Sequence, residues 1–378
     1  MGAEGRRAVV EIENVFITLE DGCRLAARIW LPEDASERPV PAVLEYIPYR
    51  KRDATAPRDQ TMHPKVAAHG YACVRVDIRG NGDSEGLMLD EYLPQELADG
   101  AEVIAWLAAQ PWCSGSVGMI GISWGGFKAL QIAALRPPAL AAVITVCSTD
   151  DRYADDIHYR GGCLLADNLA WSATMMAYSS RPPDPLVVGD AWRALWLERL
   201  EHMPFLAANW LAHQHRDAFW RHGSVAEDLS AIEVPVLAVG GWADPYSNAV
   251  FRLVAGLEVP ASGLVGPWGH KYPQLGVPGP AMDFTAEMVA WWDRWLARRL
   301  DGEVPPALRA YMLDGGDSRQ EPDERPGFWV GEAAWPSPHI EPERLFLTRA
   351  GGLAPEPGAA GTRCLASPLT TGIAGGRG

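Results

Sequence analysis

Short apolar runs alternate with longer stretches of helical periodicity over the first 300 residues. The runs Val117–Gly121, Ala141–Val146 and Val234–Val239 are almost wholly apolar, as is typical of strands buried on both faces of a parallel sheet. Between them, Gln95–Ala109 has a polar face at helical spacing, and a second helix is expected from about Gly125 to Leu135. This alternation predicts an α/β fold, with a mainly parallel sheet covered by helices on both faces.

Further runs extend the same pattern. The predicted strands are Val9–Ile17, Arg24–Leu31, Ala42–Ile47, Tyr71–Ile78 and Gly263–Val265, and a long helix is predicted over Ala281–Arg299. The first two strands flank Asp21-Gly22, a hairpin turn signal.

Two segments depart from the alternation. From about residue 149 to 230, Trp, Leu, Ala and Arg recur at helical spacing around the loop signal RPPDP, which predicts a helical cap over the carboxyl edge of the sheet. After residue 300, PPALRAYML and ERLFLT indicate antiparallel strands, and Gly, Ala and Pro then dominate. We therefore expect a catalytic domain over residues 1–148 and 231–300, a cap over 149–230, and a partial C-terminal β segment over 301–378.

The net charge, the cysteines and the apolar segments indicate which partners and which cell compartment to expect. The net charge of −15 argues against nucleic acid or an anionic membrane as a partner, because both carry negative charge. The six cysteines are scattered without metal-ligand spacing, and neither a signal-peptide core nor a membrane-length apolar run is present. The sequence thus predicts a cytoplasmic protein and implies no metal or organic cofactor.

The stretch SVGMIGISWGGFKALQIAAL contains the pattern G-x-S-x-G, with Ser123 at its centre. The pattern alone is weak evidence, but here a predicted strand precedes it and a predicted helix follows it, which is the context of a nucleophile elbow. The flanking glycines let the backbone turn steeply and expose the Ser123 hydroxyl at the edge of the sheet.

A serine nucleophile needs a base to take its proton and an acid to orient that base. Asp244 lies in the segment GWADPYSN just after the strand VPVLAV, which favours it as the acid over the alternative that it only caps a helix beginning at Pro245. Only two histidines, His270 and His339, lie downstream of Asp244. His270 directly follows a predicted strand, so order and position together favour it as the base. The upstream histidines are interpreted as surface or core residues.

Acyl transfer also needs two donors for the developing oxyanion. The backbone N–H of Trp124 is one candidate. The HGGG run common in lipases is absent, but the segment PYRKRD follows the third predicted strand, where Tyr49 can direct a phenol O–H into the site.

Five ordered motifs now indicate a family. IPYRKRD, VDIRGNGDSEG, GMIGISWGGF, VLAVGGWADPY and GPWGHK strongly resemble the cocaine-esterase (CocE/NonD) serine hydrolases, relatives of the X-prolyl dipeptidyl-peptidases and α-amino acid ester hydrolases. The resemblance implies an α/β-hydrolase fold with a helical cap, Ser123, Asp244 and His270 as the triad, and Tyr49 with the Trp124 N–H as the oxyanion hole. It also implies a C-terminal jelly roll, of which this sequence holds only the beginning. In the loop VDIRGNGDSEG, Asp77 and Arg79 are expected to brace the structure.

The expected substrate is a small ester or amide, or a short peptide. An X-Pro enzyme would need carboxylates to bind a free α-ammonium, and the cap offers five: Asp150, Asp151, Asp155, Asp156 and Asp167. The alternative is a catalytically impaired, truncated member that keeps the fold as a non-enzymatic module. Homo-oligomer formation is left open.

Overall fold

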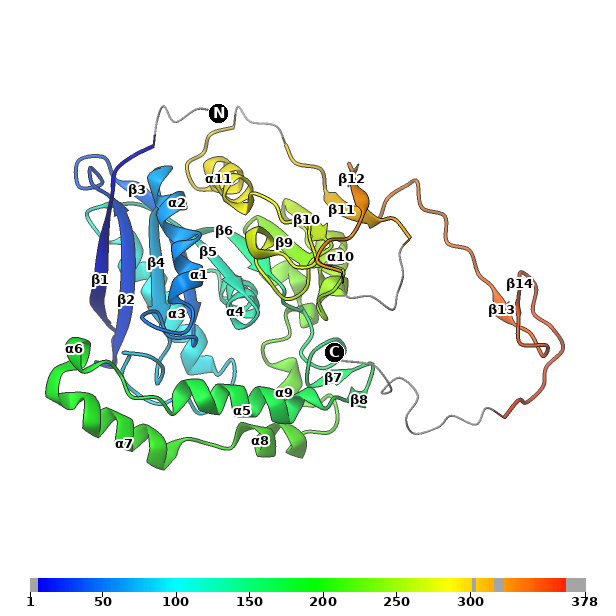
Figure 1. Ribbon diagram of the computed structural model, residues 1–378, viewed down its shortest axis with the longest axis horizontal. Coiled ribbons are helices and arrows are strands. Elements are labelled where there is room, and N and C mark those ends of the chain that lie inside the picture. Colours follow the sequence, from blue (N-terminus) through cyan, green and yellow to red (C-terminus); the bar gives the residue numbers. More distant parts are fainter. Residues whose placement is uncertain (1–5, 301–303, 316–321, 365–378) are drawn as a thin grey trace. The chain divides into compact units, whose positions relative to one another are not determined.

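The computed structural model describes residues 6–300, 304–315 and 322–364, and the chain divides into two compact units, Met1–Trp335 and Pro336–Gly378. The first unit contains a ten-stranded sheet with helices on both faces (Figure 1). The second contains the two-stranded pair β13 (Phe346–Leu347) and β14 (Leu353–Ala354).

The large sheet has the strand order β1-β2-β4-β3-β5-β6-β9-β10-β11-β12. Its strands are β1 (Val9–Thr18), β2 (Arg24–Pro32), β3 (Val40–Ile47), β4 (Ala72–Asp77), β5 (Cys113–Ile122), β6 (Leu140–Val146), β9 (Val236–Gly241), β10 (Ala261–Gly266), β11 (Leu308–Leu313) and β12 (Gly327–Glu332). Pairing is parallel from β4 to β11 and antiparallel at the two edges, β1-β2-β4 and β11-β12. The predicted mainly parallel sheet and the hairpin at Asp21-Gly22 are confirmed.

Helices cover the two faces because the buried strands alternate their side chains between two apolar clusters. On one face lie α3 (Pro94–Ala108), α4 (Trp124–Ala134) and α10 (Ser247–Gly256), and on the other lie α2 (His63–Ala68) and α11 (Phe284–Trp295). The short α1 (Ala56–Gln60) precedes α2, and η4 (Pro273–Leu275) follows β10.

The helix predicted over Ala281–Arg299 is shorter in the structure, where α11 spans Phe284–Trp295. It begins there because the Asp283 carboxylate accepts hydrogen bonds from the N–H groups of Thr285 and Ala286, a capping arrangement that fixes the first turn.

The segment after residue 300 contributes to the large sheet. The strand predicted in PPALRAYML is β11, which pairs in parallel with β10 and antiparallel with β12, so β11 and β12 extend the sheet. The segment ERLFLT overlaps β13, which pairs antiparallel with β14 and not with β11. The first compact unit accordingly ends at Trp335. The division into catalytic domain, cap and C-terminal segment stays a prediction.

The predicted cap region is helical. It contains α5 (Asp167–Ser179), α6 (Pro185–Val188), α7 (Trp192–His202), α8 (Leu206–Ala212), α9 (Ala218–Arg221), the short 3-10 helices η1 (Gly189–Ala191), η2 (Val225–Glu227) and η3 (Leu229–Ala231), and the small hairpin of β7 (Tyr159–Arg160) and β8 (Cys163–Leu164). In Figure 1 these green elements lie together beyond one end of the central strands.

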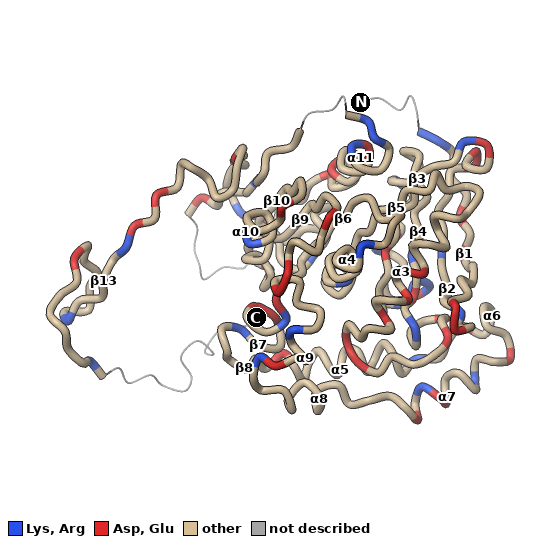
Figure 2. Tube along the Cα trace, turned by 180° about the vertical axis from the view of Figure 1, so that it is seen from behind, with Lys and Arg blue, Asp and Glu red and all other residues tan. Residues whose placement is uncertain are grey.

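Acidic and basic residues are intermixed along the sheet, the loops and the cap (Figure 2). Among the helices in the described ranges, none combines the length and apolar content that a bilayer crossing requires.

Candidate active site

Ser123 occupies a sharp turn between the end of β5 and the start of α4. Its backbone has φ 57° and ψ −124°, a conformation that side chains rarely adopt. The neighbouring glycines permit the turn: a Cβ on Gly121 would lie 2.3 Å from the carbonyl carbon of Gly125, and a Cβ on Gly125 would lie 2.4 Å from Cγ2 of Ile47. Only glycine at both positions allows this close approach of strand and helix, which leaves Ser123 partly exposed at the mouth of a pocket.

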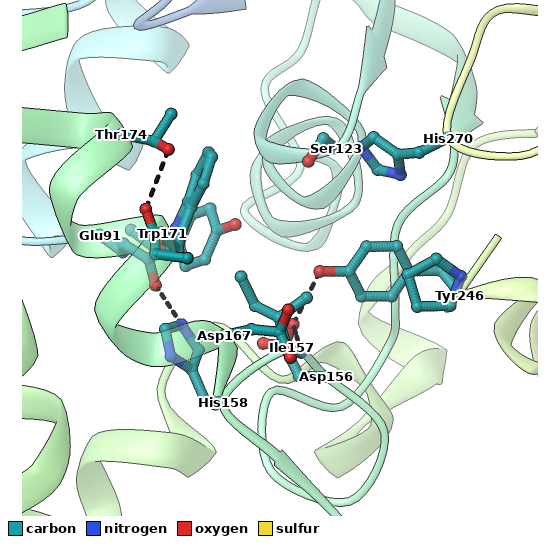
Figure 3. Close-up of a pocket in the computed structure, with 13 residues that line it drawn as sticks. Glu91, Ser123, Asp156, Ile157, His158, Asp167, Trp171, Thr174, Tyr246 and His270 are labelled. Atoms are coloured by element: carbon teal, nitrogen blue, oxygen red, sulfur yellow. Dashed lines mark hydrogen bonds and ion pairs between the residues drawn. The ribbon is translucent and has the colours of Figure 1, made fainter. Parts of the chain in front are cut away.

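His270 and Asp244 form a hydrogen-bonded pair beside Ser123. Asp244 lies in the loop after β9 and is buried, and its Oδ1 is 2.7 Å from Nδ1 of His270 in the loop after β10. Ser123 and His270 line the same pocket (Figure 3). A carboxylate that holds one imidazole nitrogen leaves the other free to accept a proton. The backbone N–H of Tyr246 also donates to Asp244, at 3.3 Å from Oδ2.

Tyr49 and Trp124 are the two residues that supply candidate oxyanion donors beside Ser123. Tyr49 comes from the segment after β3, and Trp124 is the first residue of α4. Tyr49 follows β3 and is buried, and its hydroxyl makes hydrogen bonds to the Ser123 side chain and to the Trp124 backbone. Burial raises the pKa of Tyr49, although both hydrogen bonds oppose the rise. The phenol therefore stays protonated and can donate a hydrogen bond.

The side chain of Trp124 is fixed below the site by a buried ion pair. Its indole N–H donates to Glu96 at 2.6 Å, and the same carboxylate pairs with Lys128 one turn further along α4. Lys128 lies 4.0 Å from the ring centroid of Tyr46. Burial lowers the pKa of Lys128 to about 8, despite the opposing effect of Glu96.

Ser123 and His270 open onto a cavity of about 270 Å³. Aromatic side chains make much of its wall, including Tyr92, Trp171 and Tyr246. The cavity is large enough for a small acyl group but not for a folded peptide segment.

His158 also lines this pocket. It is one of the upstream histidines that were interpreted from the sequence as surface or core residues. The Asn168 amide nitrogen donates to the carbonyls of His158 and Leu165, at 3.0 and 2.9 Å, so the Asn168 oxygen faces His158 Nδ1, 2.7 Å away. Nε2 of His158 lies 2.9 Å from the Glu91 carboxylate. Both ring nitrogens therefore donate, and His158 is an imidazolium.

This charge state agrees with the electrostatics of the wall. Burial alone would lower the pKa of His158, but the Glu91 carboxylate outweighs it and raises the pKa. Glu91 also accepts a hydrogen bond from the Trp171 indole (Figure 3 shows these groups together). The charge of Glu91 is thus compensated within the wall of the pocket. No sequence signal distinguished His158 from the other upstream histidines, because its partners come from distant segments.

Three of the five cap carboxylates are engaged in ion pairs. Arg252 on α10 binds both Asp150, at 3.0 Å from Nε, and Asp155, at 2.8 Å from Nη1. Asp151 accepts from Arg216 at 3.1 Å. These ion pairs connect the segment after β6 to α10 and to the segment between α8 and α9.

The other two carboxylates line the pocket. Asp156 is buried and accepts from the Tyr246 hydroxyl at 3.0 Å and from the Ile157 N–H at 2.7 Å, whereas Asp167 is exposed. Burial raises the pKa of Asp156 to about 6, and nearby His158 opposes that rise. Asp156 therefore changes charge within the ordinary working range of an enzyme.

Asp77 and Arg79 make bracing contacts, as expected. Asp77 accepts from the backbone N–H of Lys51 at 2.8 Å, and Arg79 donates two hydrogen bonds to Asp99 at 2.7 and 2.8 Å. His339, the alternative base, belongs to the second compact unit, where its N–H donates to the Ser337 hydroxyl.

Two groups of potential metal ligands occur in the described part of the chain. Glu45, Asp59 and His63 form one, but Arg58 and Arg75 already pair with its carboxylates, so no uncompensated charge is left to bind a cation. Cys147, Asp244 and His270 form the other.

Comparison with known proteins identifies a family and several relatives of this chain. The model of the S15 family of X-Pro dipeptidyl-peptidases matches residues 21–272. Cocaine esterase from Rhodococcus sp. (strain MB1 Bresler) is 28% identical over 398 residues, which cover 96% of this chain and 65% of that protein. The Xaa-Pro dipeptidyl-peptidase of Lactobacillus delbrueckii subsp. lactis is 23% identical over 320 residues, which cover 79% of this chain and 38% of that protein. The chain thus spans less than two thirds of the length of either relative.

Solved structures show the same fold. The CocE/NonD family hydrolase SACOL2612 from Staphylococcus aureus superposes with a TM-score of 0.69 at 20% identity, covering 90% of this chain and 59% of that one. An α-amino acid ester hydrolase superposes with a TM-score of 0.69 at 21% identity, covering 96% of this chain and 65% of that one. The predicted α/β-hydrolase fold is therefore confirmed.

Proposed function

Because this chain belongs to the S15 family, and within it to the CocE/NonD serine hydrolases, we propose that it cleaves an ester or amide through an acyl-enzyme on Ser123. The hydroxyl oxygen of Ser123 attacks the substrate carbonyl while Nε2 of His270 takes its proton. Asp244 holds Nδ1 of His270 and stabilises the imidazolium that forms.

The negative charge that develops on the carbonyl oxygen needs fixed donors. The Tyr49 O–H, which interacts with the Ser123 side chain and the Trp124 backbone, and the backbone N–H of Trp124 fill this role. When the tetrahedral intermediate collapses, His270 gives its proton to the leaving alcohol or amine. It then activates water, which hydrolyses the acyl-enzyme and regenerates Ser123.

The observation that carries this proposal is the 2.7 Å contact between His270 and Asp244 at the same pocket as the strained Ser123 turn. Its test is turnover of an activated acyl ester by the parent chain and by Ser123→Ala. We expect a loss of at least about 10³-fold in kcat. An unchanged rate in Ser123→Ala would contradict the proposal.

The pocket also bears on the choice between ester and X-Pro substrates. Glu91 is compensated by His158, and Asp150, Asp151 and Asp155 are paired with arginines, which leaves Asp156 and Asp167 to face a substrate ammonium. Turnover of an acyl ester, its α-amino analogue and a Gly-Pro anilide compares these classes directly. A preference for the α-amino ester below about tenfold, or about 1.4 kcal/mol, means that no dedicated ammonium site exists.

A further inference from the structure

The buried Cys147 lies next to Asp244 and His270, the proposed acid and base. The sulfur of Cys147, a carboxylate oxygen of Asp244 and a ring nitrogen of His270 all lie within 4.8 Å of one another. Cys147 and Asp244 are 1% and 4% exposed, whereas the side chain of His270 is 41% exposed. The cluster is therefore closed on the protein side and open toward the substrate pocket through His270.

The backbone holds the thiol in this place. Cys147 directly follows β6, and its N–H donates to the Val239 carbonyl on β9 at 2.8 Å. Its φ of 49° is rare for a residue with a side chain and costs on the order of 1–3 kcal/mol. The sulfur lies 3.7 Å from the carbonyl oxygen of Lys271, the residue after His270. The ends of β6, β9 and β10 thus bring three different ligand atoms together.

We propose that Cys147, Asp244 and His270 form an inhibitory site for a thiophilic divalent cation, with Zn²⁺ as the best fit. Thiolate sulfur, carboxylate oxygen and imidazole nitrogen are the three ligand types of protein zinc sites, at about 2.0–2.3 Å from the ion. Tetrahedral geometry at these lengths places ligand atoms about 3.5 Å apart. Small side-chain shifts within the cluster reach this spacing, once the 2.7 Å contact between Asp244 and His270 opens. Water from the pocket takes the fourth position.

Binding at this site removes the base by changing its tautomer. Zn²⁺ takes Nδ1 of His270, and the neutral imidazole then carries its one proton on Nε2, where it cannot accept the proton of Ser123. The Cys147 thiol releases its proton to solvent and becomes the thiolate ligand. No electron is transferred, and chelation of the ion restores both groups. The effect on activity rests on the proposed function, but ion binding itself does not.

The first test measures inhibition. Ester turnover is titrated with Zn²⁺ and with Cd²⁺ in the parent chain, Cys147→Ser, Cys147→Ala and the control Cys163→Ser, which alters an exposed thiol away from the pocket. Each rate is expressed relative to the same variant without metal. We expect EDTA-reversible inhibition of the parent and of Cys163→Ser, and a half-inhibitory concentration at least about tenfold higher in both Cys147 variants. Equal sensitivity of the Cys147 variants and the parent to inhibition by Zn²⁺ and Cd²⁺ would refute the proposed metal site.

The second test does not depend on turnover. Sulfur-to-Cd²⁺ charge-transfer absorption is recorded during Cd²⁺ titration of Ser123→Ala and of Ser123→Ala/Cys147→Ala. We expect one equivalent of Cd²⁺ to give a thiolate band that the double variant lacks. Identical titrations would refute the metal site. An active Ser123→Ala chain would refute the proposed function while leaving this result intact.

Discussion

The hydroxyl of Tyr272 donates a 2.8 Å hydrogen bond to the fully buried carboxylate of Glu45. Tyr272 lies two residues after His270, and Glu45 lies on β3 four residues before Tyr49. The same carboxylate faces His63 at 3.0 Å and Arg58 at 2.9 Å. One buried anion thus connects the loop that carries the proposed base to the strand that leads to the proposed oxyanion donor.

Tyr272→Phe tests this connection. Removing one donor to a buried carboxylate is expected to lower the free energy of unfolding by about 1.5–3 kcal/mol, as measured by urea denaturation. The matched control is Tyr46→Phe on β3: among the described residues, nothing forms a hydrogen bond with the buried Tyr46 hydroxyl. Tyr46→Phe should change stability by less than Tyr272→Phe, and the reverse order would refute the connection.

Tyr49→Phe tests the oxyanion hole. The change removes one of two donors and keeps the ring, so kcat for an activated ester should fall by about 10²–10³ with little change in KM. Tyr178→Phe is the control, because the Tyr178 ring lies 5.4 Å from the Tyr49 ring and loses only a neighbouring hydroxyl. A Tyr49→Phe rate close to that of Tyr178→Phe would exclude Tyr49 from the oxyanion hole.

The buried pair of Glu96 and Lys128 is expected to matter for stability. Glu96→Gln keeps an acceptor for the Trp124 indole but leaves Lys128 uncompensated, at a cost of about 3–5 kcal/mol in the free energy of unfolding. A neutral lysine suffers less from burial, so this loss should shrink as pH rises. Glu96→Gln/Lys128→Met should recover most of the stability in denaturant titrations. A double variant as unstable as Glu96→Gln would contradict this account.

Asp156 should make the preference for cationic acyl groups depend on pH. With a pKa of about 6, its carboxyl is mostly neutral at pH 5 and charged at pH 7.5. The kcat/KM ratio between an ester with a quaternary ammonium in the acyl group and its neutral tert-butyl isostere should therefore rise about tenfold over this range. Groups that act equally on the two esters cancel in this ratio, so only groups that face the ammonium contribute to the rise. Asp156→Asn should flatten the rise, and the exposed Asp167→Asn should keep it. If the ratio still rises with pH in Asp156→Asn, a group other than Asp156 causes the pH dependence.

The site residues that could be predicted from the sequence are those that follow predicted strands. Ser123, Asp244, His270 and Tyr49 each come directly after a predicted strand, and parallel strands bring their carboxyl ends to one edge. In the structure Asp244 pairs with His270, the Tyr49 hydroxyl interacts with Ser123 and the Trp124 backbone, and Ser123 and His270 line one pocket.

The remainder of the pocket depended on tertiary packing. Glu91 lies between β4 and α3, His158 lies in the loop after β6, and Trp171 lies on α5, with no spacing rule that links them. For the same reason, the sequence offered five cap carboxylates without separating Asp156 from those that arginines neutralise.

The most direct measurement for the proposed mechanism is labelling of the purified chain with a fluorophosphonate, followed by intact mass and peptide mapping. This reagent requires an activated serine, its base and an oxyanion hole at one place. The account predicts a single adduct, located on Ser123. A folded, monodisperse chain without an adduct, or with an adduct on another residue, would contradict it and favour a non-enzymatic module.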